Sequence, residues 1–352
     1  MKCSPISAGL PHALCAWLLM VALPALADDR RAAAPASQPA EAVVAVGPIR
    51  ISVADLERSI AFYADVLTFE PIARTEYAGA AFCAEQGLPA GAIARAAGAR
   101  LGDESIELIE FDNPRGRPLP ADSRSNDRWF QHIAIIVRDM DAAYARLQKH
   151  AVRAASAGGP QRLPDWNPTA GGIRAFYFRD PDGHYLEILQ FPPGKGDAKW
   201  HAASDRIFLG IDHTAIVVAD TAASLRFYRD GLGLRVAGES VNHGVEQERL
   251  NNVRGARLRI TTLRAPLGPG IELLEYLEPR DGRPYPSGAQ CNDLLSWQPT
   301  VYAAAPEKLF HRLRVLSTSR IGENPADSKV TVARDPDGHA LRIATPPEQP
   351  VR

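Results

Sequence analysis

The stretch HTAIVVADTAASLRFYRDGLGL, residues 213–234, decides the fold because it joins a strand pattern to a helix pattern across one capping residue. Side chains from His213 to Val217 alternate between two faces, as in a strand that is buried on one side. Asp220 then stands where its carboxylate can cap a helix, on which we expect Tyr228 to pack into the core. This strand followed by a helix is the unit from which the rest of the chain is interpreted.

The same arrangement occurs in both halves of the 352-residue chain. Asn126-Asp127 recurs as Asn292-Asp293 at an offset of 166, whereas the string DPDGH at 180–184 recurs at 335–339 at an offset of 155. The second half therefore lacks 166 − 155 = 11 residues, which match part of the proline- and glycine-rich loop 158–172. Helix residues recur at an offset of 220 − 55 = 165: Asp55, Ser59, Phe62, Tyr63 and Leu67 return as Asp220, Ser224, Phe227, Tyr228 and Leu232.

Each half divides again into two modules with the order βαβββ, numbered one to four along the chain. Because one module cannot bury its sheet face alone, we predict an α+β fold in which the four modules pair into two curved-sheet clefts, with helices outside. A ligand is expected in the hollow of a cleft. The predicted modules are 46–111 and 130–192 in a first domain (46–192), then 209–277 and 297–346 in a second domain (209–346), with a linker at 193–208.

The first 27 residues have the features of a secretory signal peptide. Lys2 gives a positive start, an uncharged apolar run extends from Ala13 to Leu23, and Ala25-Leu26-Ala27 offers a cleavage site. The run is shorter than the roughly 20 residues that span a bilayer, which argues against a membrane anchor. Residues 28–45 lack apolar periodicity, and we expect a flexible tether there. We therefore expect a periplasmic or secreted protein without a membrane segment after cleavage.

Composition narrows the class of partner. The formal net charge is −1 and no basic block occurs, so nothing in the sequence favours nucleic acid or an anionic membrane surface. We expect a small-molecule substrate and a monomer or homodimer. Cys83 and Cys291 remain after signal cleavage and no CxxC pair exists, so we favour two buried thiols over a disulfide or a cysteine metal site.

The strings HTAIVVADTAASLRFYRDGLGL (213–234) and FRDPDGHYLEILQF (178–191) resemble the vicinal-oxygen-chelate superfamily. This superfamily includes glyoxalase I, methylmalonyl-CoA epimerase, extradiol dioxygenases, and the bleomycin- and fosfomycin-resistance proteins. The resemblance covers residues 46–346 and is specific for fold. It says less about the reaction, because the superfamily contains lyases, epimerases, oxygenases and non-catalytic binders.

The resemblance implies two metal-ligand positions per module, one that opens the first strand and one on the last strand. In chain order these positions are Pro48 and Glu107, His132 and Glu187, His213 and Glu272, and Gln298 and Arg342. Pro48 has no side-chain donor atom, and Arg342 is a fixed cation that repels a metal. The remaining two imidazoles and two carboxylates of modules two and three suit a divalent first-row metal.

The pairing of modules decides how these ligands combine. If modules two and three share a cleft, His132, Glu187, His213 and Glu272 form one complete site, and modules one and four form an inactive twin. If modules one and two share a cleft, its candidate ligands are His132, Glu107 and Glu187, and the other cleft keeps His213 and Glu272. We favour the first, crossed pairing because the intact positions lie in adjacent modules.

The resemblance to glyoxalase I implies a metal-dependent lyase or isomerase that uses Zn, Ni, Fe, Mn or Co and acts on a small oxygenated substrate. Two substrate oxygens then chelate the metal, which stabilises a developing enolate. Either Glu187 or Glu272 is expected to move the proton beside the carbonyl.

Two alternatives remain open. Extradiol dioxygenases hold Fe(II) with two His and one Glu in modules three and four, where Gln298 and Arg342 break the pattern here. A non-catalytic binder, such as a resistance protein, needs only an apolar cleft.

Polar residues near the expected cleft are candidates for substrate contact. Trp166 and Asn167 lie in the loop present in only one half, which fits a lid or a substrate wall. Gln247, Arg249 and Asn251 lie in a polar stretch of module three. His184 and His339, which follow the DPDG turns, are expected to face solvent.

Overall fold

The computed structural model describes residues 42–316 and 330–347. The predicted signal peptide and the tether up to residue 41 lie outside the described residues. Strand β1 (Val43–Ser52) begins within the last few residues of the predicted tether. None of the helices in the described ranges has the length and apolarity needed to cross a bilayer.

Modules one to three contain the predicted elements in the predicted order, with a short helix added in modules one and three, whereas the described part of module four shows one helix and three strands. Module one contains β1, α1 (Leu56–Ala61), η1 (Phe62–Val66), β2 (Glu70–Tyr77), α2 (Ala80–Gln86), β3 (Ile93–Leu101) and β4 (Glu104–Asn113). Module two contains β5 (Gln131–Val137), α3 (Met140–Lys149), β6 (Gln161–Arg162), β7 (Arg174–Arg179) and β8 (Tyr185–Gln190), and η2 (Ala198–His201) follows it. Module three contains β9 (Phe208–Val218), α4 (Thr221–Leu225), η3 (Arg226–Gly231), β10 (Arg235–Asn242), α5 (Val245–Asn251), β11 (Arg257–Arg264) and β12 (Gly270–Glu278). Module four contains β13 (Trp297–Ala303), α6 (Pro306–Leu316), β14 (Val330–Arg334) and β15 (Ala340–Ala344).

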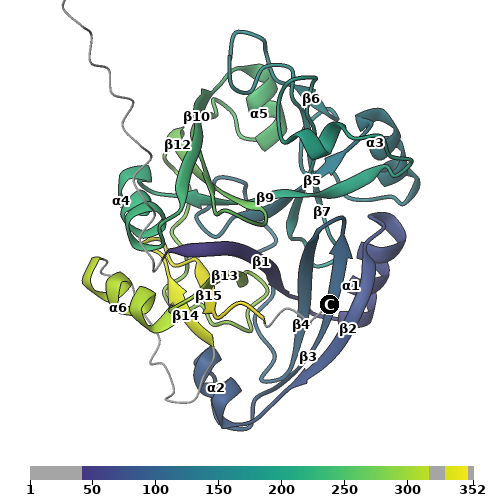
Figure 1. Ribbon diagram of the computed structural model, residues 1–352. Helices are drawn as coiled ribbons and strands as arrows, with labels where there is room; N and C mark the ends of the chain where they lie inside the picture. Colours follow the sequence, from purple (N-terminus) through teal and green to yellow (C-terminus); the bar gives the residue numbers. More distant parts are fainter. Residues whose placement is uncertain (1–41, 317–329, 348–352) are drawn as a thin grey trace, which may run out of the picture. The chain divides into compact units, whose positions relative to one another are not determined.

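The two sheets pair the modules in the crossed way. One sheet has the strand order β14-β15-β13-β1-β4-β3-β2, and the other has β10-β11-β12-β9-β5-β8-β7-β6 (Figure 1). At the centres of the sheets, β1 is antiparallel to β13 and β5 is antiparallel to β9. The α+β fold of paired modules is therefore confirmed, and modules two and three share one sheet. We call the sheets the two-three sheet and the one-four sheet.

The hydrophobic cores on the helix side follow the sequence halves instead. One core joins modules one and two, with Tyr63 and Ile135 among its fully buried members. The other joins modules three and four, with Phe227 and Ile343 fully buried. Each half of the chain therefore shares a core, while each sheet crosses between the halves. Tyr228 is also a buried member of the second core, so its predicted packing into the core is confirmed.

The long connections after modules one and three are joined to each other by hydrogen-bonded ion pairs. Asp127 accepts hydrogen bonds from Arg283, with Nη2 to Oδ2 at 2.6 Å. Asp293 accepts in the same way from Arg117, with Nε to both oxygens at 3.1 Å. The aspartates of the two recurring Asn-Asp pairs thus anchor the connections.

The prediction that His184 and His339 face solvent is wrong. Both side chains are buried, and each Nδ1 lies within hydrogen-bond distance of the first Asp of its own turn: 2.8 Å to Asp180 and 3.0 Å to Asp335. The phenol of Tyr63, from module one, also contacts Asp180 at 3.4 Å. A turn is exposed only if nothing packs on it, and here the turns pack against the neighbouring module.

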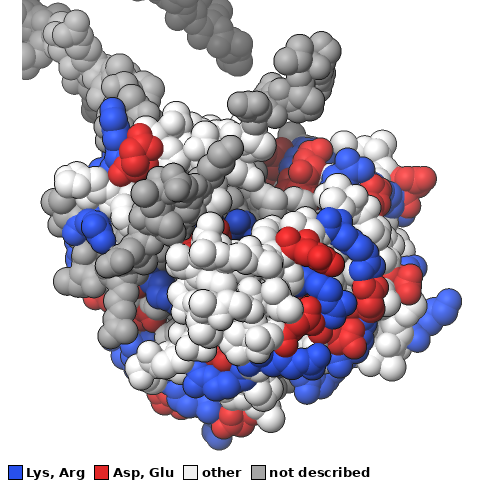
Figure 2. All heavy atoms as spheres, turned by 90° about the horizontal axis from the view of Figure 1, so that it is seen from below, with Lys and Arg blue, Asp and Glu red and all other residues white. Residues whose placement is uncertain are grey.

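Charges of both signs are interspersed on the described part of the face shown in Figure 2. Many of the exposed arginines form ion pairs, such as Arg100 with Glu70 at 2.7 Å. Inside, Cys83 and Cys291 are free and buried in one small core. The expected state of two buried thiols is therefore confirmed.

Candidate metal centre

All four predicted metal ligands lie on one face of the two-three sheet: His132, Glu187, His213 and Glu272. The register explains this placement. Ala134 of β5 lies opposite both His213 of β9 and Glu187 of β8. Ala215 of β9 lies opposite both His132 and Glu272. Directly paired residues point to the same side of a sheet, so the six side chains share one face, and the two alanines leave space between the four ligands.

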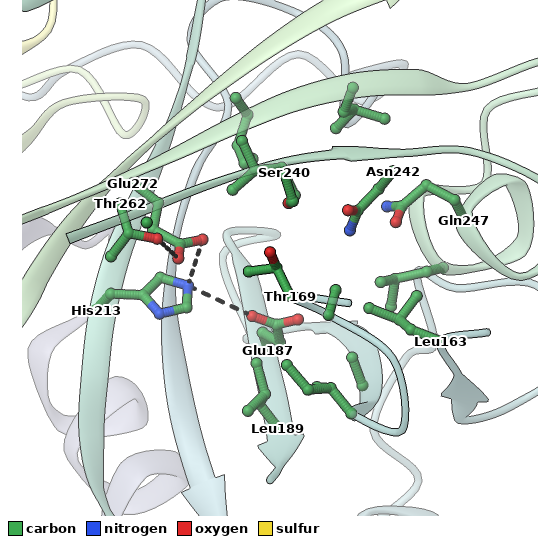
Figure 3. A pocket seen from close by; sticks show the side chains of 18 of the residues that line it. Leu163, Thr169, Glu187, Leu189, His213, Ser240, Asn242, Gln247, Thr262 and Glu272 are labelled. Carbon is green, nitrogen blue, oxygen red and sulfur yellow. Dashed lines mark hydrogen bonds and ion pairs between the residues drawn. The ribbon is translucent and has the colours of Figure 1, made fainter. Parts of the chain in front are cut away.

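The ligand side chains converge in that space, and Figure 3 shows Glu187 and Glu272 pointing toward His213. His132 Nε2 lies 3.2 Å from Glu187 Oε2, and His213 Nε2 lies 3.8 Å from the same oxygen. One donor atom from each of these three residues lies within 4.8 Å of the other two. On its other side, His213 Nε2 lies 3.3 Å from Glu272 Oε2. The structure therefore brings together all four residues that the sequence singled out.

These distances fit a single divalent ion. Donor atoms that bind one first-row ion at about 2.1 Å lie about 3.0–3.4 Å apart. The contacts of 3.2 Å and 3.3 Å fall in this range, and the contact of 3.8 Å between His213 and Glu187 lies above it. Two imidazole nitrogens with two carboxylate oxygens also form a common donor set for such ions. The side chains of His132, Glu187 and His213 are almost fully buried, whereas that of Glu272 is 17% exposed. The residues present therefore fit the metal that the sequence pattern suggested.

Asp212 fixes the orientation of the His213 ring. Its Oδ2 lies 2.9 Å from His213 Nδ1, so Nδ1 donates to the carboxylate and Nε2 faces the other ligands. Arg264 Nη2 and Trp200 Nε1 donate to the same carboxylate, at 2.7 Å and 3.1 Å. A carboxylate behind a metal-binding imidazole sets the tautomer and raises the basicity of the ring. His132 has no such support, because its buried Nδ1 has no hydrogen-bond partner among the described residues.

The acidic surroundings favour protonated His213 when no metal is bound. Burial by itself lowers the pKa of this imidazole, but the carboxylates of Glu272, Asp212 and Glu187 outweigh it and raise the pKa to about 9. Burial raises the pKa of Asp212, but contact with His213 and Arg264 outweighs burial and holds the pKa well below its usual range. A metal that binds here must therefore displace a proton from His213 at neutral pH.

A pocket opens beside these ligands, with a cavity of about 120 Å³. Its walls combine apolar side chains such as Leu250 and Leu258 with polar ones such as Ser240 and Thr262. Thr262 Oγ1 donates to Glu272 Oε1 at 2.6 Å, so this hydroxyl anchors the most exposed of the four ligands. The pocket is small, partly apolar and ends on the ligand cluster, which suits a small-molecule site.

The five predicted substrate-contact residues differ in where they lie relative to the pocket. Among these five described residues, Gln247 alone lines the pocket. Asn167 and Asn251 are buried beside it, and their side chains form hydrogen bonds with Asn242 and Tyr276. The remaining two lie at the surface: Trp166, which stacks on His243, and Arg249.

The loop that occurs in only one half does form part of the pocket wall. Its residues Leu163, Thr169 and Ala170 line the cavity, and Thr169 Oγ1 donates to the backbone oxygen of Glu239 at 3.3 Å. Lys195 Nζ holds the loop from behind through three backbone oxygens, at 2.8–3.0 Å. The loop therefore lines the pocket, but through residues other than the predicted Trp166 and Asn167.

Sequence reasoning missed Asp212 and Asn242. Asp212 directly precedes a predicted ligand, and that adjacency was an available signal. Asn242 ends β10 and carried no signal of its own, because the sequence pattern did not predict the helix that follows it.

The equivalent positions in the one-four sheet carry arginines around a carboxylate instead of a set of candidate metal ligands. Arg50 lies opposite Gln298 and Glu107, as Ala134 lies opposite His213 and Glu187. Its guanidinium extends where the alanine left space, and Nε donates to Glu107 Oε2 at 2.7 Å. Arg342 Nη1 lies 3.7 Å from the same carboxylate. Two guanidinium groups therefore surround the one acidic ligand position that remains, which excludes a metal.

Comparison with known proteins points to one superfamily. A sequence model of the Glyoxalase/Bleomycin resistance protein/Dioxygenase superfamily matches residues 45–188 and 210–343. A protein named 2-epi-5-epi-valiolone epimerase from Actinomyces sp is 37% identical over 158 residues, which cover 43% of this chain and 81% of the relative.

Solved structures share the fold at low sequence identity. A mutant of glyoxalase I from Zea mays aligns with a TM-score of 0.57 at 15% identity, covering 87% of this chain and 92% of that protein. Glyoxalase I from Zea mays itself gives a TM-score of 0.53 with the same identity and coverage. Likeness at this identity concerns the fold alone.

Proposed function

Because this chain belongs to the Glyoxalase/Bleomycin resistance protein/Dioxygenase superfamily, we propose that it is a metal-dependent isomerase or lyase that moves a proton beside a carbonyl group. The proposal includes export, so that the mature enzyme acts on a small oxygenated substrate in the periplasm or outside the cell. The similarity to a protein named as an epimerase supports a proton-transfer reaction over ring cleavage.

One observation carries the proposal. Donor atoms of His132, Glu187 and His213, from three strands of one sheet, lie within 4.8 Å of one another at the end of a pocket. Carboxylates buried in this low-dielectric space need a cation close by. Protonated His213 is that cation when no metal is bound, and a divalent ion takes over the role when it displaces the proton. When bound, it supplies a Lewis acid that withdraws electron density from a substrate carbonyl.

The geometry supports separate roles for the two glutamates. Glu187 is buried between both imidazoles, which suits a permanent ligand. Glu272 contacts His213 alone of the two histidines, is more exposed, and has its own anchor in Thr262. We therefore assign Glu272 as the base that takes the proton from the carbon beside the carbonyl. The electron pair left behind moves to the carbonyl oxygen and gives an enolate. Protonated Glu272 then returns the proton to the same carbon, or to the former carbonyl carbon while the neighbouring hydroxyl passes its own proton to the enolate oxygen and becomes the new carbonyl.

Metal analysis of purified mature protein tests the centre, and proton exchange tests the reaction. We expect close to one equivalent of a divalent first-row metal per chain. In deuterated water, the hydrogen beside the carbonyl of a turned-over α-hydroxyketone is expected to exchange. Metal-free protein that performs this exchange at full rate contradicts the proposal.

A ring-cleaving dioxygenase is a second candidate, and one observation favours it. The tightest cluster, His132, Glu187 and His213, is itself a set of two imidazoles and one carboxylate, the set that many Fe(II) oxygenases use. It lies in modules two and three, whereas extradiol dioxygenases use modules three and four. Oxygen uptake by the iron-loaded protein with catechol separates the two candidates, because the isomerase consumes no oxygen.

The export part of the proposal rests on the sequence of residues 1–27. We expect protein isolated from its natural host to begin at Asp28. An intact N-terminus in a cytoplasmic fraction contradicts export without affecting the proposed chemistry.

A further inference from the structure

Two side-chain amides line the pocket away from the metal centre. Asn242 ends β10 and Gln247 lies on α5, and both are almost fully buried, at 4% and 2% exposure. Figure 3 shows the two amides close together, on the side of the pocket opposite His213 and Glu272. Their hydrogen-bond partners determine which atom of each amide is left for a ligand.

A chain of hydrogen bonds fixes the Gln247 amide. Ser125 Oγ donates to the backbone oxygen of Asn251 at 2.5 Å, so Tyr276 donates its phenolic proton to Ser125 at 3.2 Å. The phenol oxygen then accepts from Asn251 Nδ2 at 2.8 Å, which directs Asn251 Oδ1 toward Gln247. Gln247 Nε2 donates to that oxygen. The carbonyl oxygen, Gln247 Oε1, is left buried without a hydrogen-bond partner among the described residues.

A second chain of hydrogen bonds fixes the Asn242 amide so that its nitrogen, and not its oxygen, is left for a ligand. Asn167 Oδ1 accepts from the backbone nitrogens of Thr169 and Ala170, at 3.1 Å and 2.9 Å. The other atom of that amide, Nδ2, therefore donates to Asn242 Oδ1, at 2.7 Å. Because Asn242 Oδ1 accepts that bond, Asn242 Nδ2 is the atom of this pocket-lining amide that is left to donate to a ligand.

The pair thus offers one acceptor and one donor to a ligand. A hydroxyl group satisfies both, since it donates to Gln247 Oε1 and accepts from Asn242 Nδ2. A carboxylate or phosphate cannot donate to Gln247. Moreover, no lysine or arginine occurs among the described residues that line the pocket. An anionic group would therefore be buried there without a countercharge, next to an unpaired carbonyl oxygen.

We infer that Asn242 and Gln247 form the subsite that selects the substrate, and that the substrate is an uncharged carbonyl compound with a hydroxyl group remote from the reacting carbon. Apolar side chains between the two ends, such as Leu250 and Leu258, contact its carbon frame. This inference rests on the proposed function for the reacting end and adds the class of substrate. It excludes carboxylated and phosphorylated substrates.

Binding of three ring ketones to the metal-loaded protein tests the inference. 2-Keto-myo-inositol is uncharged and carries remote hydroxyls, 2-hydroxycyclohexanone lacks them, and 3-dehydroquinate carries a carboxylate. We expect calorimetry to show the tightest binding for 2-keto-myo-inositol and at least tenfold weaker binding for 3-dehydroquinate. Equal or tighter binding of 3-dehydroquinate, or no binding of 2-keto-myo-inositol, overturns the inference.

Two nearly isosteric variants assign the effect to the amides. Gln247→Met and Asn242→Leu are each expected to weaken binding of 2-keto-myo-inositol by about 10- to 100-fold. Binding of 2-hydroxycyclohexanone is expected to change less than threefold, which also reports an intact pocket. Glu248→Gln, on the same helix but outside the pocket, serves as the matched control.

If Gln247→Met binds 2-keto-myo-inositol as tightly as the unmodified protein does, the amide subsite is wrong. Metal content and hydrogen exchange on an α-hydroxyketone, measured on every sample, separate that failure from failure of the proposed function. A subsite error leaves one metal per chain and normal exchange, whereas an error in the proposed function shows as missing metal or missing exchange.

Discussion

The two-three sheet and the one-four sheet are built from the same module with the same central register, yet one gathers the candidate metal ligands and the other gathers arginines. In the two-three sheet, Ala134 leaves open space opposite Glu187. In the one-four sheet, Arg50 takes the corresponding place opposite Glu107, and its guanidinium pairs with that carboxylate. A buried carboxylate at this point of the module needs a cation: Arg50 provides it in the one-four sheet, and protonated His213 or the proposed metal provides it in the two-three sheet. The comparison teaches that the one-four sheet differs from the proposed metal site by an added cation as well as by missing ligands.

Placing in the two-three sheet an arginine like Arg50 of the one-four sheet is expected to have the largest effect. In Ala134→Arg, the guanidinium can pair with Glu187 as Arg50 pairs with Glu107, and it fills the space between the ligands. We expect no detectable bound metal by elemental analysis, because a fixed cation replaces the ion. Ala134→Ser keeps the space and is the control, with metal content unchanged. A fully metal-loaded Ala134→Arg protein means that the ion lies elsewhere.

Replacement of the proposed base, Glu272, is expected to slow the reaction and to leave the fold intact. Glu272→Gln keeps the shape and the bond from Thr262 but cannot accept a proton. We expect hydrogen exchange on a substrate to slow by about 10²- to 10⁴-fold with metal still bound. Glu107→Gln alters the position that corresponds to it in module one and is expected to leave the exchange rate unchanged. Comparable rates for Glu272→Gln and the unmodified protein assign the base to another residue.

The same Glu107→Gln variant is expected to lower the stability of the protein. Burial raises the pKa of Glu107, but Arg50 and Arg342 outweigh burial and lower it, so the carboxylate is ionised at neutral pH. Its loss leaves Arg50 buried with a poorer partner, and both Nη atoms of Arg50 already lack hydrogen bonds in the described residues. We expect the free energy of unfolding to fall by about 3–5 kcal/mol. Urea unfolding measures this, and a change below about 1 kcal/mol contradicts the cation-replacement account.

The smallest predicted effect concerns pH. The pKa of His213 in the metal-free protein, about 9, lies above the ordinary value of 6.5. The stabilisation from this imidazolium is therefore fully present below pH 6.5 and is lost as the pH rises through 9. Because metal must displace the proton, apparent metal affinity is expected to rise about tenfold per pH unit up to pH 9 and then level off. Calorimetry in buffers of different ionisation enthalpy counts the proton, and metal affinity that does not change between pH 7 and 9 contradicts this assignment.

Much of the fold and the ligand set could be predicted because both depend on repetition and on strand alternation. The offset of 165 between Glu107 and Glu272, and the capping Asp55 and Asp220, locate equivalent positions without any knowledge of contacts. Alternation then places His213 on a known face of its strand.

What the sequence did not reveal depends on contacts between distant segments. The buried state of His184 arises from packing of the DPDG turn against module one, and the local pattern carries no trace of that neighbour. The helix α5 is a seven-residue polar segment that begins after Gly244, which has a φ of +97°. A helix of this length is too short to be recognised from its hydrophobic periodicity. The sequence therefore could not show that Gln247 faces the pocket while Arg249 lies at the surface.

The central claim is that one cation-binding face has kept its metal ligands while its counterpart has replaced them with arginine. Equilibrium dialysis of the metal-free protein against a divalent first-row ion, followed by elemental analysis, tests this most directly. We expect one tightly bound equivalent per chain, and none after His213→Ala. Two equivalents, or one equivalent that survives His213→Ala, contradict the account.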